Sequence, residues 1–384
     1  MKILHTSDWH ICHSLYNFDR SFEQEDMLRQ IVEIVRSEQP DVFLLSGDVY
    51  HTAQPSAAAQ HLFADIMTDL HLAAPTMRIF VTAGNHDSPS RHDIFSRPWR
   101  ALNVTTIGSV DADNIEDLIY EIPDIGFVIA VPFVHWRNMP ENLYRRLSDI
   151  CSKRNSENLP VVMMAHTAVA GVNYSGHDHS DERTVGGIDC ISPEEFGKEF
   201  DYLALGHIHK SQTINRSRPV IRYSGTPLAV SFDEDYEHSV SIVEISRDTE
   251  EIEIREVPIE NPRPLVTLPR ESATTFDNIL ALLSDFPDDI PAYLRLNIEI
   301  EDFLPHNARE RVLDAIRDKK CRFCTFNVTR KGSKDSGSER ESLTVNEFRE
   351  LSPIEVACRY AKESEMELTD EQIEMLTDLF NENT

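Results

Sequence analysis

The stretch Ile3-Leu4-His5-Thr6-Ser7-Asp8-Trp9-His10 begins with apolar side chains and turns polar at its end. Its first part belongs to a run, Lys2–Thr6, that predicts a β-strand. Asp8 and His10 follow that strand with one residue between them, so both side chains can point the same way. Because α/β proteins gather ligands outside the carboxyl ends of their strands, this stretch predicts an α/β domain with a polar site at one sheet edge.

The same arrangement recurs along the first half of the chain. Further polar groups, each following an apolar run, are Gly47-Asp48, Gly84-Asn85-His86-Asp87, His166 and Gly206-His207-Ile208-His209. Besides Lys2–Thr6, strands are predicted at Asp41–Leu45, Arg78–Thr82, Phe127–Val131, Pro160–Ala165, Tyr202–Leu205 and Val240–Ile245. The fold can therefore bring all of these groups to one edge of a sheet.

Amphipathic segments between these strands predict helices. One apolar stripe consists of Met27, Ile31, Ile34 and Val35, and a second consists of Leu62, Phe63, Ile66, Met67 and Leu70. Both are interpreted as surfaces that face the core, because a helix that covers a sheet buries one such stripe.

Composition predicts a soluble protein with two or three modules. The chain has 384 residues and is 40% hydrophobic, which is enough for a substantial core. Its first residues lack the apolar run of a secretory signal, and no later run is long enough to cross a bilayer, so we expect a cytoplasmic location and no membrane contact. The six scattered cysteines fit a reducing compartment. Cys321 and Cys324 have zinc spacing without a second pair, and they are interpreted as ordinary strand residues.

The formal net charge of −29 argues against a nucleic-acid protein if that charge is spread evenly. The argument is weak for a metal enzyme, because bound cations supply positive charge locally. A larger assembly could also contribute basic surface that this chain lacks.

Four regions are predicted along the chain. Residues 1–260 form the α/β domain, and the pattern strand, helix, strand, helix, strand over residues 261–330 indicates a small second α/β module. Its predicted elements are Leu265–Leu268, Phe276–Leu283, Tyr293–Ile300, Ala308–Ile316 and Arg322–Val328. A Gly/Ser-rich stretch predicts a flexible linker at residues 331–342. Residues 343–384 are predicted to be helical, with a short apolar stripe that favours docking on a partner protein.

The polar groups suit a centre of two metal ions. Two ions roughly 3.5–4 Å apart and bridged by a carboxylate can activate water and neutralise charge at phosphorus. The mixed set of carboxylate, imidazole and amide ligands favours Mn²⁺, with Mg²⁺, Fe²⁺ or Zn²⁺ as competitors. Asn85 can offer its carbonyl oxygen to a metal, which leaves His86 beside the substrate. Asp87 is then expected to orient His86 through a ring nitrogen.

The series Asp-x-His, Gly-Asp, Gly-Asn-His-Asp, His and Gly-His-x-His resembles that of the calcineurin-like metallophosphoesterases, whose fold has two mixed sheets between helices, αββα. Several longer stretches are also similar to the SbcD family, the nuclease subunits of SbcCD complexes. These stretches are residues 3–10, Gly47-Asp48-Val49-Tyr50, Ala204-Leu205-Gly206-His207-Ile208-His209 and Tyr223-Ser224-Gly225-Thr226-Pro227-Leu228. The specific matches cover residues 1 to about 235, and the second module agrees in architecture only.

The resemblance implies roles for individual residues. One ion would be held by Asp8, His10, Asp48 and His209, and the other by Asp48, Asn85, His166 and His207, with Asp48 as the bridge. His86 would protonate the leaving oxygen or steady the transition state, and His51 would be a second histidine on the substrate side. Cys12 departs from the pattern, because many relatives have glycine there. A Cys12 thiol could narrow the opening, and we do not expect it to be a ligand.

The resemblance also implies a function and partners. The main hypothesis is a Mn²⁺-dependent DNA nuclease, exonuclease or endonuclease, that works with an SbcC-like SMC-type ATPase as a homodimer within a heterotetramer. The second module would cap the active site and contact DNA, and the C-terminal helices would dock on the ATPase. A small-molecule phosphodiesterase or phosphatase with the same metal core is the alternative. A scaffold without activity is disfavoured, because such relatives usually lose ligands and none is lost here.

Overall fold

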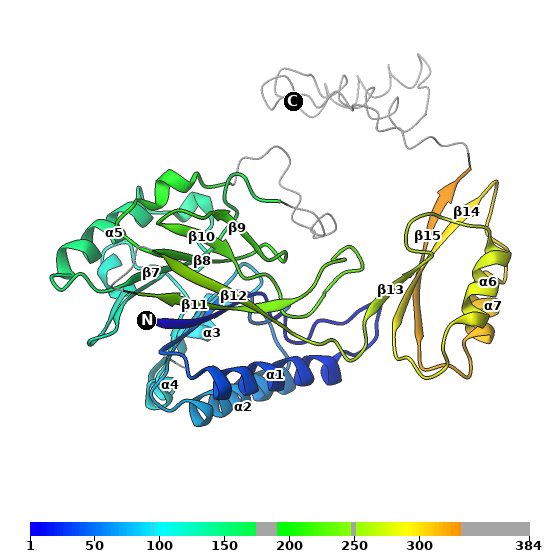
Figure 1. Cartoon of the computed structure of the whole chain (residues 1–384), viewed down its shortest axis with the longest axis horizontal. Coiled ribbons are helices and arrows are strands. Elements are labelled where there is room, and N and C mark those ends of the chain that lie inside the picture. The colour runs from blue at the N-terminus through cyan, green and yellow to red at the C-terminus, as the bar shows by residue number, and fades with distance from the viewer. Residues whose placement is uncertain (95, 174–189, 247–250, 332–384) are drawn as a thin grey trace, which may run out of the picture. The chain divides into compact units, whose positions relative to one another are not determined.

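Two six-stranded sheets carry the first part of the chain in the computed structural model, which describes residues 1–94, 96–173, 190–246 and 251–331 (Figure 1). The first sheet has the order β12 (Ile252–Pro258), β11 (Ser239–Ile245), β1 (Lys2–Thr6), β2 (Val42–Ser46), β3 (Arg78–Thr82) and β4 (Val104–Ile107). The second has the order β5 (Ile119–Ile122), β6 (Gly126–Ala130), β7 (Val161–His166), β8 (Tyr202–Gly206), β10 (Val220–Tyr223) and β9 (Gln212–Asn215).

Each sheet has four parallel strands flanked by antiparallel ones. In the first sheet β1, β2, β3 and β4 run parallel, and β11 and β12 pair antiparallel beside them. In the second sheet β6, β7, β8 and β10 run parallel, with β5 and β9 antiparallel at the edges. The parallel strands of a sheet end at the same edge, so the loops after β1, β2 and β3 are neighbours, and so are those after β7 and β8.

Side chains along the central strands point alternately to the two faces of the sheet, and this explains how the sheets pack. Ile3 and Leu44 belong to the core that the first sheet shares with the second, whereas Leu4, Phe43 and Leu45 belong to the core on the opposite face. Successive side chains of a strand point to opposite faces, so a strand buried on both faces is apolar throughout. All these side chains are fully buried.

Helices cover the outer faces. The α-helices of this part of the chain are α1 (Ser21–Glu38), α2 (Ala57–Ala73), α3 (Pro89–Ile94), α4 (Ser96–Trp99) and α5 (Leu143–Arg154). The stripe predicted on α1 and that on α2 pack against the first sheet, with Ile34 and Leu62 only partly buried. Figure 1 shows α5 on the side of the second sheet away from α1 and α2. The predicted αββα sandwich is therefore confirmed.

The second module contains the parallel sheet β13 (Leu265–Leu268), β14 (Tyr293–Ile300) and β15 (Arg322–Arg330), with helices α6 (Phe276–Asp285) and α7 (Ala308–Ala315). These elements follow the order expected from the sequence. Their core includes Ile279, Leu296 and Val312, and Cys321 is buried in it. Cys324 packs with Leu15, Phe232 and Tyr293 in a separate small cluster. Cys324 lies on β15, as interpreted, whereas Cys321 directly precedes that strand. The predicted linker from residue 332 onward and the C-terminal helices lie outside the described residues.

Five strands of the structure were not predicted, namely β4, β5, β9, β10 and β12. The first four have only four residues each, which is too short for periodicity to distinguish a strand from a loop. β12 pairs only with β11 and carries charged residues at an exposed sheet edge. Within the described residues, no helix combines the length and apolar character that a bilayer span requires.

Packing between the sheets gives the first prediction. Phe80 on β3 is fully buried in the core shared by the two sheets, and its ring centroid lies 5.3 Å from that of Tyr120. We expect Phe80→Ala to lower the free energy of unfolding by about 3–5 kcal/mol, because it removes buried apolar surface and leaves a cavity. Urea denaturation followed by circular dichroism measures the change.

The matched control is Phe22→Ala on α1, where the side chain is 64% exposed. We expect this change to stay within about 0.5 kcal/mol of the unmodified chain. An equal decrease in the free energy of unfolding for the two variants would contradict the assignment of Phe80 to the core between the sheets.

Candidate metal centre

Loops from both sheets meet at one place, and each brings polar side chains. Asp8 and His10 follow β1, Asp48 follows β2, and Asn85 and His86 follow β3. From the second sheet, His166 ends β7, and His207 and His209 follow β8. Backbone hydrogen bonds join the loops, such as those from Asp8 N to Gly47 O at 3.0 Å and from His10 N to Asp48 O at 3.1 Å.

Two groups of ligand atoms form in this region. Single side-chain ligand atoms of Asp8, His10 and His209 lie within 4.8 Å of one another, and so do those of Asp8, Asp48 and His166. All five of these residues are buried. The Nε2 atoms of His10 and His209 are only 3.2 Å apart. The structure thus brings together residues from distant parts of the sequence.

Asn85 and His207 complete the second group. Asn85 Oδ1 lies 2.8 Å from His166 Nε2 and 3.2 Å from His207 Nδ1. His166 Nε2 also lies 3.4 Å from Asp48 Oδ2. The four residues that the resemblance assigns to one ion are therefore neighbours.

The chemistry of these atoms fits a metal ion. His166 Nδ1 lies 2.8 Å from the carbonyl oxygen of Ser46, which can only accept a hydrogen bond, so Nδ1 carries the proton. In the neutral ring Nε2 then offers a lone pair, yet it faces the oxygens of Asn85 and Asp48, which are acceptors too. Acceptors that converge in a buried place need a cation between them, and divalent metals suit this mixed donor set.

The pKa values of the buried side chains also indicate that positive charge is favoured between them. Burial opposes charge on His166, but Asp48 and Asp8 outweigh it and raise the pKa of His166 to about 10. Burial likewise opposes charge on Asp48, while His166 and His10 hold the pKa of its carboxyl well below the usual range. Burial lowers the pKa of His10. Negative charge on Asp48 is thus stabilised by the cationic character of its histidine neighbours, together with the hydrogen bond from the backbone N–H of His86.

The backbone at the site is strained in several places. Asp8, His10, Cys12, Asp48 and His207 all have positive φ angles, from 45° to 96°. Such angles are unusual for residues with a β-carbon and cost of order 1–3 kcal/mol each. Their concentration at the loops that carry polar side chains indicates that the fold imposes this conformation to aim those side chains.

Two glycines leave the space that the candidate ligands occupy. A β-carbon on Gly47, which has φ 84°, would overlap the ring of His166. A β-carbon on Gly84 would overlap the carboxylate and backbone of Asp48. Gly47 therefore permits the turn after β2 and the close approach of His166 from the second sheet, and Gly84 permits the close approach of the loops after β2 and β3.

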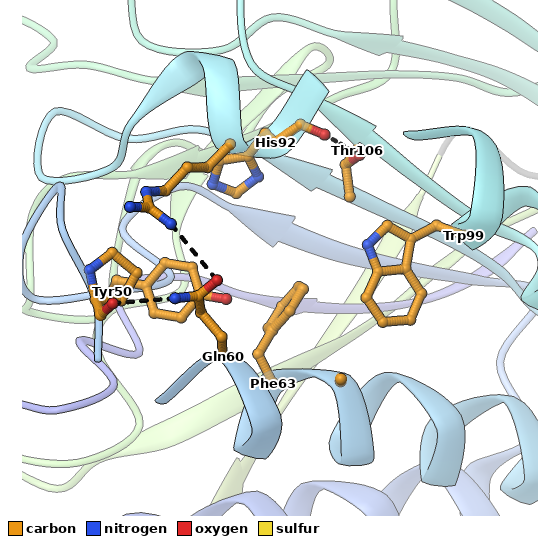
Figure 2. Close-up of a pocket in the computed structure, with 9 residues that line it drawn as sticks. Tyr50, Gln60, Phe63, His92, Trp99 and Thr106 are labelled. Atoms are coloured by element: carbon orange, nitrogen blue, oxygen red, sulfur yellow. Dashed lines mark hydrogen bonds between the residues drawn. The ribbon is translucent and has the colours of Figure 1, made fainter. Parts of the chain in front are cut away.

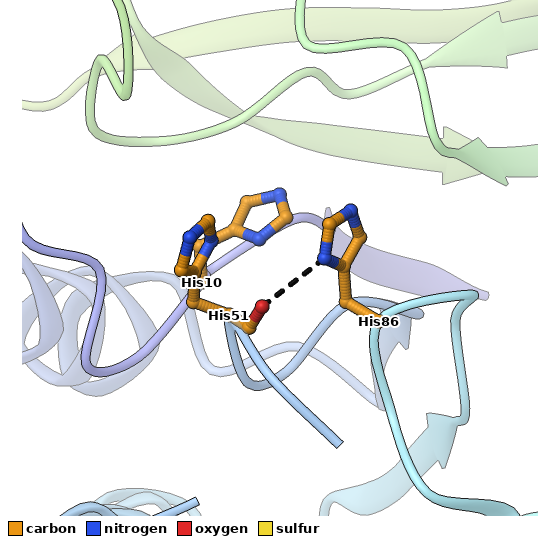
Figure 3. Close-up of side chains that lie close together, drawn as sticks. All are labelled: His10, His51 and His86. Atoms are coloured by element: carbon orange, nitrogen blue, oxygen red, sulfur yellow. Dashed lines mark hydrogen bonds between the residues drawn. The ribbon is translucent and has the colours of Figure 1, made fainter. Parts of the chain in front are cut away.

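His51, His86 and His10 form a cluster beside the buried groups (Figure 3). The ring of His86 lies 5.1 Å from that of His10 and 5.7 Å from that of His51, with which it stacks. His86 Nδ1 is 3.1 Å from the carbonyl oxygen of His51 and donates to it. His51 and His86 are partly exposed, unlike His10, so they form the side of the centre that solvent reaches.

Asp87 differs from its expected role. Its carboxylate does not orient His86, but accepts hydrogen bonds from the backbone N–H groups of Val49, Tyr50 and Gly84 at 2.9–3.0 Å. The sequence prediction was wrong because it paired two residues that are neighbours in the chain. In the structure, His86 Nδ1–H instead donates a hydrogen bond to the carbonyl oxygen of His51. Asp87 ties the loop after β2 to the loop after β3 and so fixes the separation of Asp48 and Asn85.

An apolar cavity of about 120 Å³ lies near the hydrogen-bonded loops that Asp87 joins (Figure 2). Phe63, Trp99 and Tyr50 line it, and His92, whose Nε2 is 3.6 Å from Asp87 Oδ2, closes one side. None of its lining residues is a carboxylate. Its lining residues do not belong to the groups of candidate ligand atoms found in the described residues.

Glu234 is a residue that sequence reasoning missed. Its Oε1 lies 2.8 Å from His209 Nδ1, and the carboxylate is buried. Glu234 lies in the acidic run Asp233-Glu234-Asp235, which does not follow an apolar strand, so the pattern used to find the other residues could not detect it. Its burial and its contact with His209 are visible only in the structure.

Cys12 is exposed and lies outside the groups of ligand atoms found in the described residues. Its φ angle of 73° lies in the left-handed region that favours glycine, which agrees with the glycine noted in related sequences. Its Sγ is 3.4 Å from Ser56 Oγ at the start of α2.

Known proteins share these features over most of the chain. The family model described as calcineurin-like phosphoesterase matches residues 1–211, and one described as type 5 capsule protein repressor C-terminal domain matches residues 261–365. The chain is 32% identical over 324 residues to the SbcD subunit of the SbcCD nuclease of Bacillus subtilis (strain 168), covering 79% of this chain and 80% of that protein. It is 27% identical over 338 residues to the subunit of the same name in Escherichia coli (strain K12), covering 81% of each.

The first family model covers more than half of the chain, and the sheets that carry the buried acceptor centre lie largely within that match. The relatives align over about four fifths of their length, so the similarity continues into the second module. The chain therefore belongs to the calcineurin-like metal-dependent phosphoesterases and, within them, to the family of SbcD subunits of SbcCD nucleases.

Proposed function

We propose that this protein is a manganese-dependent DNA nuclease that hydrolyses phosphodiester bonds with two metal ions. The observation that carries the proposal is the buried convergence of carboxylate, imidazole and amide acceptors with two partly exposed histidines beside it. Its relatives are named nuclease subunits, which favours a nucleic acid over a small phosphodiester as the substrate.

The ligands divide into two sets that share a carboxylate. Asp8, His10 and His209 would hold one ion, Asn85, His166 and His207 the other, and Asp48 would bridge them. Divalent ions bound there supply charge neutralisation at phosphorus and make water acidic enough to serve as a nucleophile near neutral pH. Mn²⁺ suits the mixed oxygen and nitrogen donors, and Mg²⁺, Fe²⁺ or Zn²⁺ would compete for the same places.

His86 would stabilise or protonate the leaving oxygen, with His51 as a second substrate-side histidine. The hydrogen bond from His86 Nδ1 to the carbonyl of His51 assigns the proton of the neutral ring to Nδ1 and fixes the ring orientation. Nε2 of the neutral ring then carries a lone pair, so protonation of the leaving oxygen would require a second proton on Nε2. His86 N also donates to Asp48 Oδ1 at 2.9 Å, so the backbone of the catalytic residue is anchored to the proposed bridging ligand. These two contacts would hold His86 beside the proposed ligands.

The remaining regions would serve DNA and a partner. Residues 1–260 would form the nuclease domain, residues 261–330 a capping module that contacts DNA, and residues 331–342 a linker to helices at 343–384. From Lys331 to the end the chain has six basic and fourteen acidic side chains, so this part is a poor DNA contact. It would instead dock on an SbcC-like SMC-type ATPase that gates access to duplex DNA.

The purified chain tests the function directly. Cleavage of linear duplex, hairpin and single-stranded DNA is compared with hydrolysis of bis-p-nitrophenyl phosphate, with Mn²⁺, Mg²⁺ or a chelator, and with or without the ATPase. We expect manganese-stimulated DNA cleavage that the chelator abolishes. Rapid hydrolysis of small diesters without DNA cleavage under any of these conditions would refute the nuclease assignment.

The role of His86 gives a second prediction. We expect His86→Ala to lower the rate of DNA cleavage by about 100-fold or more, because loss of a general acid or base typically costs 10²–10⁴ in rate. Both metals should stay bound, since His86 is not one of the proposed ligands, and elemental analysis after gel filtration measures them. His61→Ala on α2, where the imidazole is exposed, is the matched control with unchanged cleavage. Full activity of His86→Ala would exclude the proposed role.

The C-terminal part gives a third prediction. A chain that ends at Gly332 should lose binding to the ATPase in co-purification but keep its hydrolysis of bis-p-nitrophenyl phosphate, because the proposed ligands all precede residue 210. In the full chain, Leu376→Asp places a charge in the predicted apolar stripe and should weaken the complex. Asp378→Ala changes the opposite side of the predicted helix and should leave it intact. An undiminished complex with the truncated chain would show the docking assignment to be wrong.

A further inference from the structure

We propose that Glu234 is a positioning residue that sets the affinity of one metal of the pair and leaves the other almost unaffected. The inference rests on the proposed function in one respect only, namely that the buried centre holds two divalent ions. It concerns how Glu234 prepares His209 to bind the ion that Asp8 and His10 share.

Glu234 fixes the tautomer of His209. A carboxylate only accepts hydrogen bonds, so at 2.8 Å the His209 Nδ1–H must donate to Oε1 of Glu234. The lone pair of the neutral ring is then on Nε2, which faces His10 Nε2 at 3.2 Å inside the group formed with Asp8. A ring with the other tautomer would present a proton to the ion instead of a lone pair.

Surrounding contacts hold the carboxylate in place. Glu234 is 6% exposed, and its Oε2 accepts a hydrogen bond from the backbone N–H of Val230 at 3.1 Å. On the adjacent residue, Asp233 Oδ1 accepts from Arg295 Nη1 at 2.6 Å. The carboxylate of Glu234 and the side chain of the preceding residue are therefore both held in place, which limits the positions that the His209 ring can take.

Thr226 ties the same region to the two chain segments of this ion site. Its backbone N–H donates to the carbonyl of His209 at 2.9 Å, and its hydroxyl donates to the carbonyl of Asp8 at 2.8 Å. His238 Nδ1 donates in turn to the carbonyl of Thr226 at 2.8 Å. Loss of the Glu234 carboxylate would thus leave the backbone of His209 in place and change mainly the ring.

The surroundings of His166 and His10 differ from those of His209. His166 donates its Nδ1 proton to the uncharged carbonyl of Ser46, and the buried Nδ1 of His10 has no hydrogen-bond partner within the described residues. A carboxylate makes the imidazole it accepts from a more basic ligand than a carbonyl does. Glu234 therefore acts on the ion site that contains His209, through its contact with that ring.

Metal titration of the full-length chain tests this difference. Calorimetry with Mn²⁺ should give two ions per chain for the unmodified protein. In Glu234→Ala we expect one ion to bind about 10–100-fold more weakly, the range typical for loss of such a partner, and the other to bind as before. Electron paramagnetic resonance should then show isolated Mn²⁺ in place of a coupled pair at limiting metal.

Two further variants make the outcome decisive. Glu234→Gln keeps the size of the side chain and an oxygen acceptor, so this variant should fold. It should lower the affinity for the same ion by a smaller factor than Glu234→Ala does. Glu237→Ala removes an exposed carboxylate of the same segment and should leave both affinities unchanged. The proposal is overturned if Glu234→Ala binds both ions normally, or if Glu234→Gln weakens both ions equally, as a general structural defect would.

Metal binding is measured here without DNA, so the two proposals fail in different ways. A chain that binds two ions and cleaves no DNA contradicts the proposed function but not the role of Glu234. Normal cleavage together with two unaltered affinities in both Glu234 variants contradicts the role of Glu234 but not the proposed function.

Discussion

The structure depends on one electrostatic constraint, the convergence of buried acceptor atoms from two sheets. Asp8, Asp48 and His166 lie where water is excluded, and carboxylates in such a place need positive charge close by. The two sheets pack face to face so that the ends of β1, β2 and β3 meet those of β7 and β8. Burial opposes charge on His166, but Asp48 and Asp8 raise the pKa of His166 to about 10, so the arrangement favours positive charge at the place where the proposed ions would bind.

Rigid support makes that convergence possible. Asp87 joins two loops through three backbone N–H groups, and Ser46 fixes the ring of His166 through its carbonyl. Positive φ angles at Asp8 and Asp48 cost free energy that the large cores on both faces of the first sheet offset. Residues with no direct part in the proposed reaction therefore determine where the ligands point.

Much of the fold and of the candidate site could be predicted because it follows local patterns. A strand buried on both faces is apolar throughout, and a polar residue directly after it marks the sheet edge, which is how Asp8, Asp48 and His166 were recognised. Short strands such as β5 and β9 carry too few residues for this signal. Glu234 and the true partners of Asp87 depend on contacts between distant segments, and no spacing in the sequence encodes those contacts.

The acidic composition is compatible with action on DNA once the range of electrostatic forces is considered. At physiological ionic strength, exposed charges are screened beyond about 8 Å, so the net charge of −29 does not determine the potential at the centre. Two divalent ions would reverse the local sign there and attract a phosphate. The rest of the surface still gains little from counterion release, which supplies most non-specific affinity for DNA. Under the proposed function, a partner with basic surface would hold the duplex, and this chain would cut it.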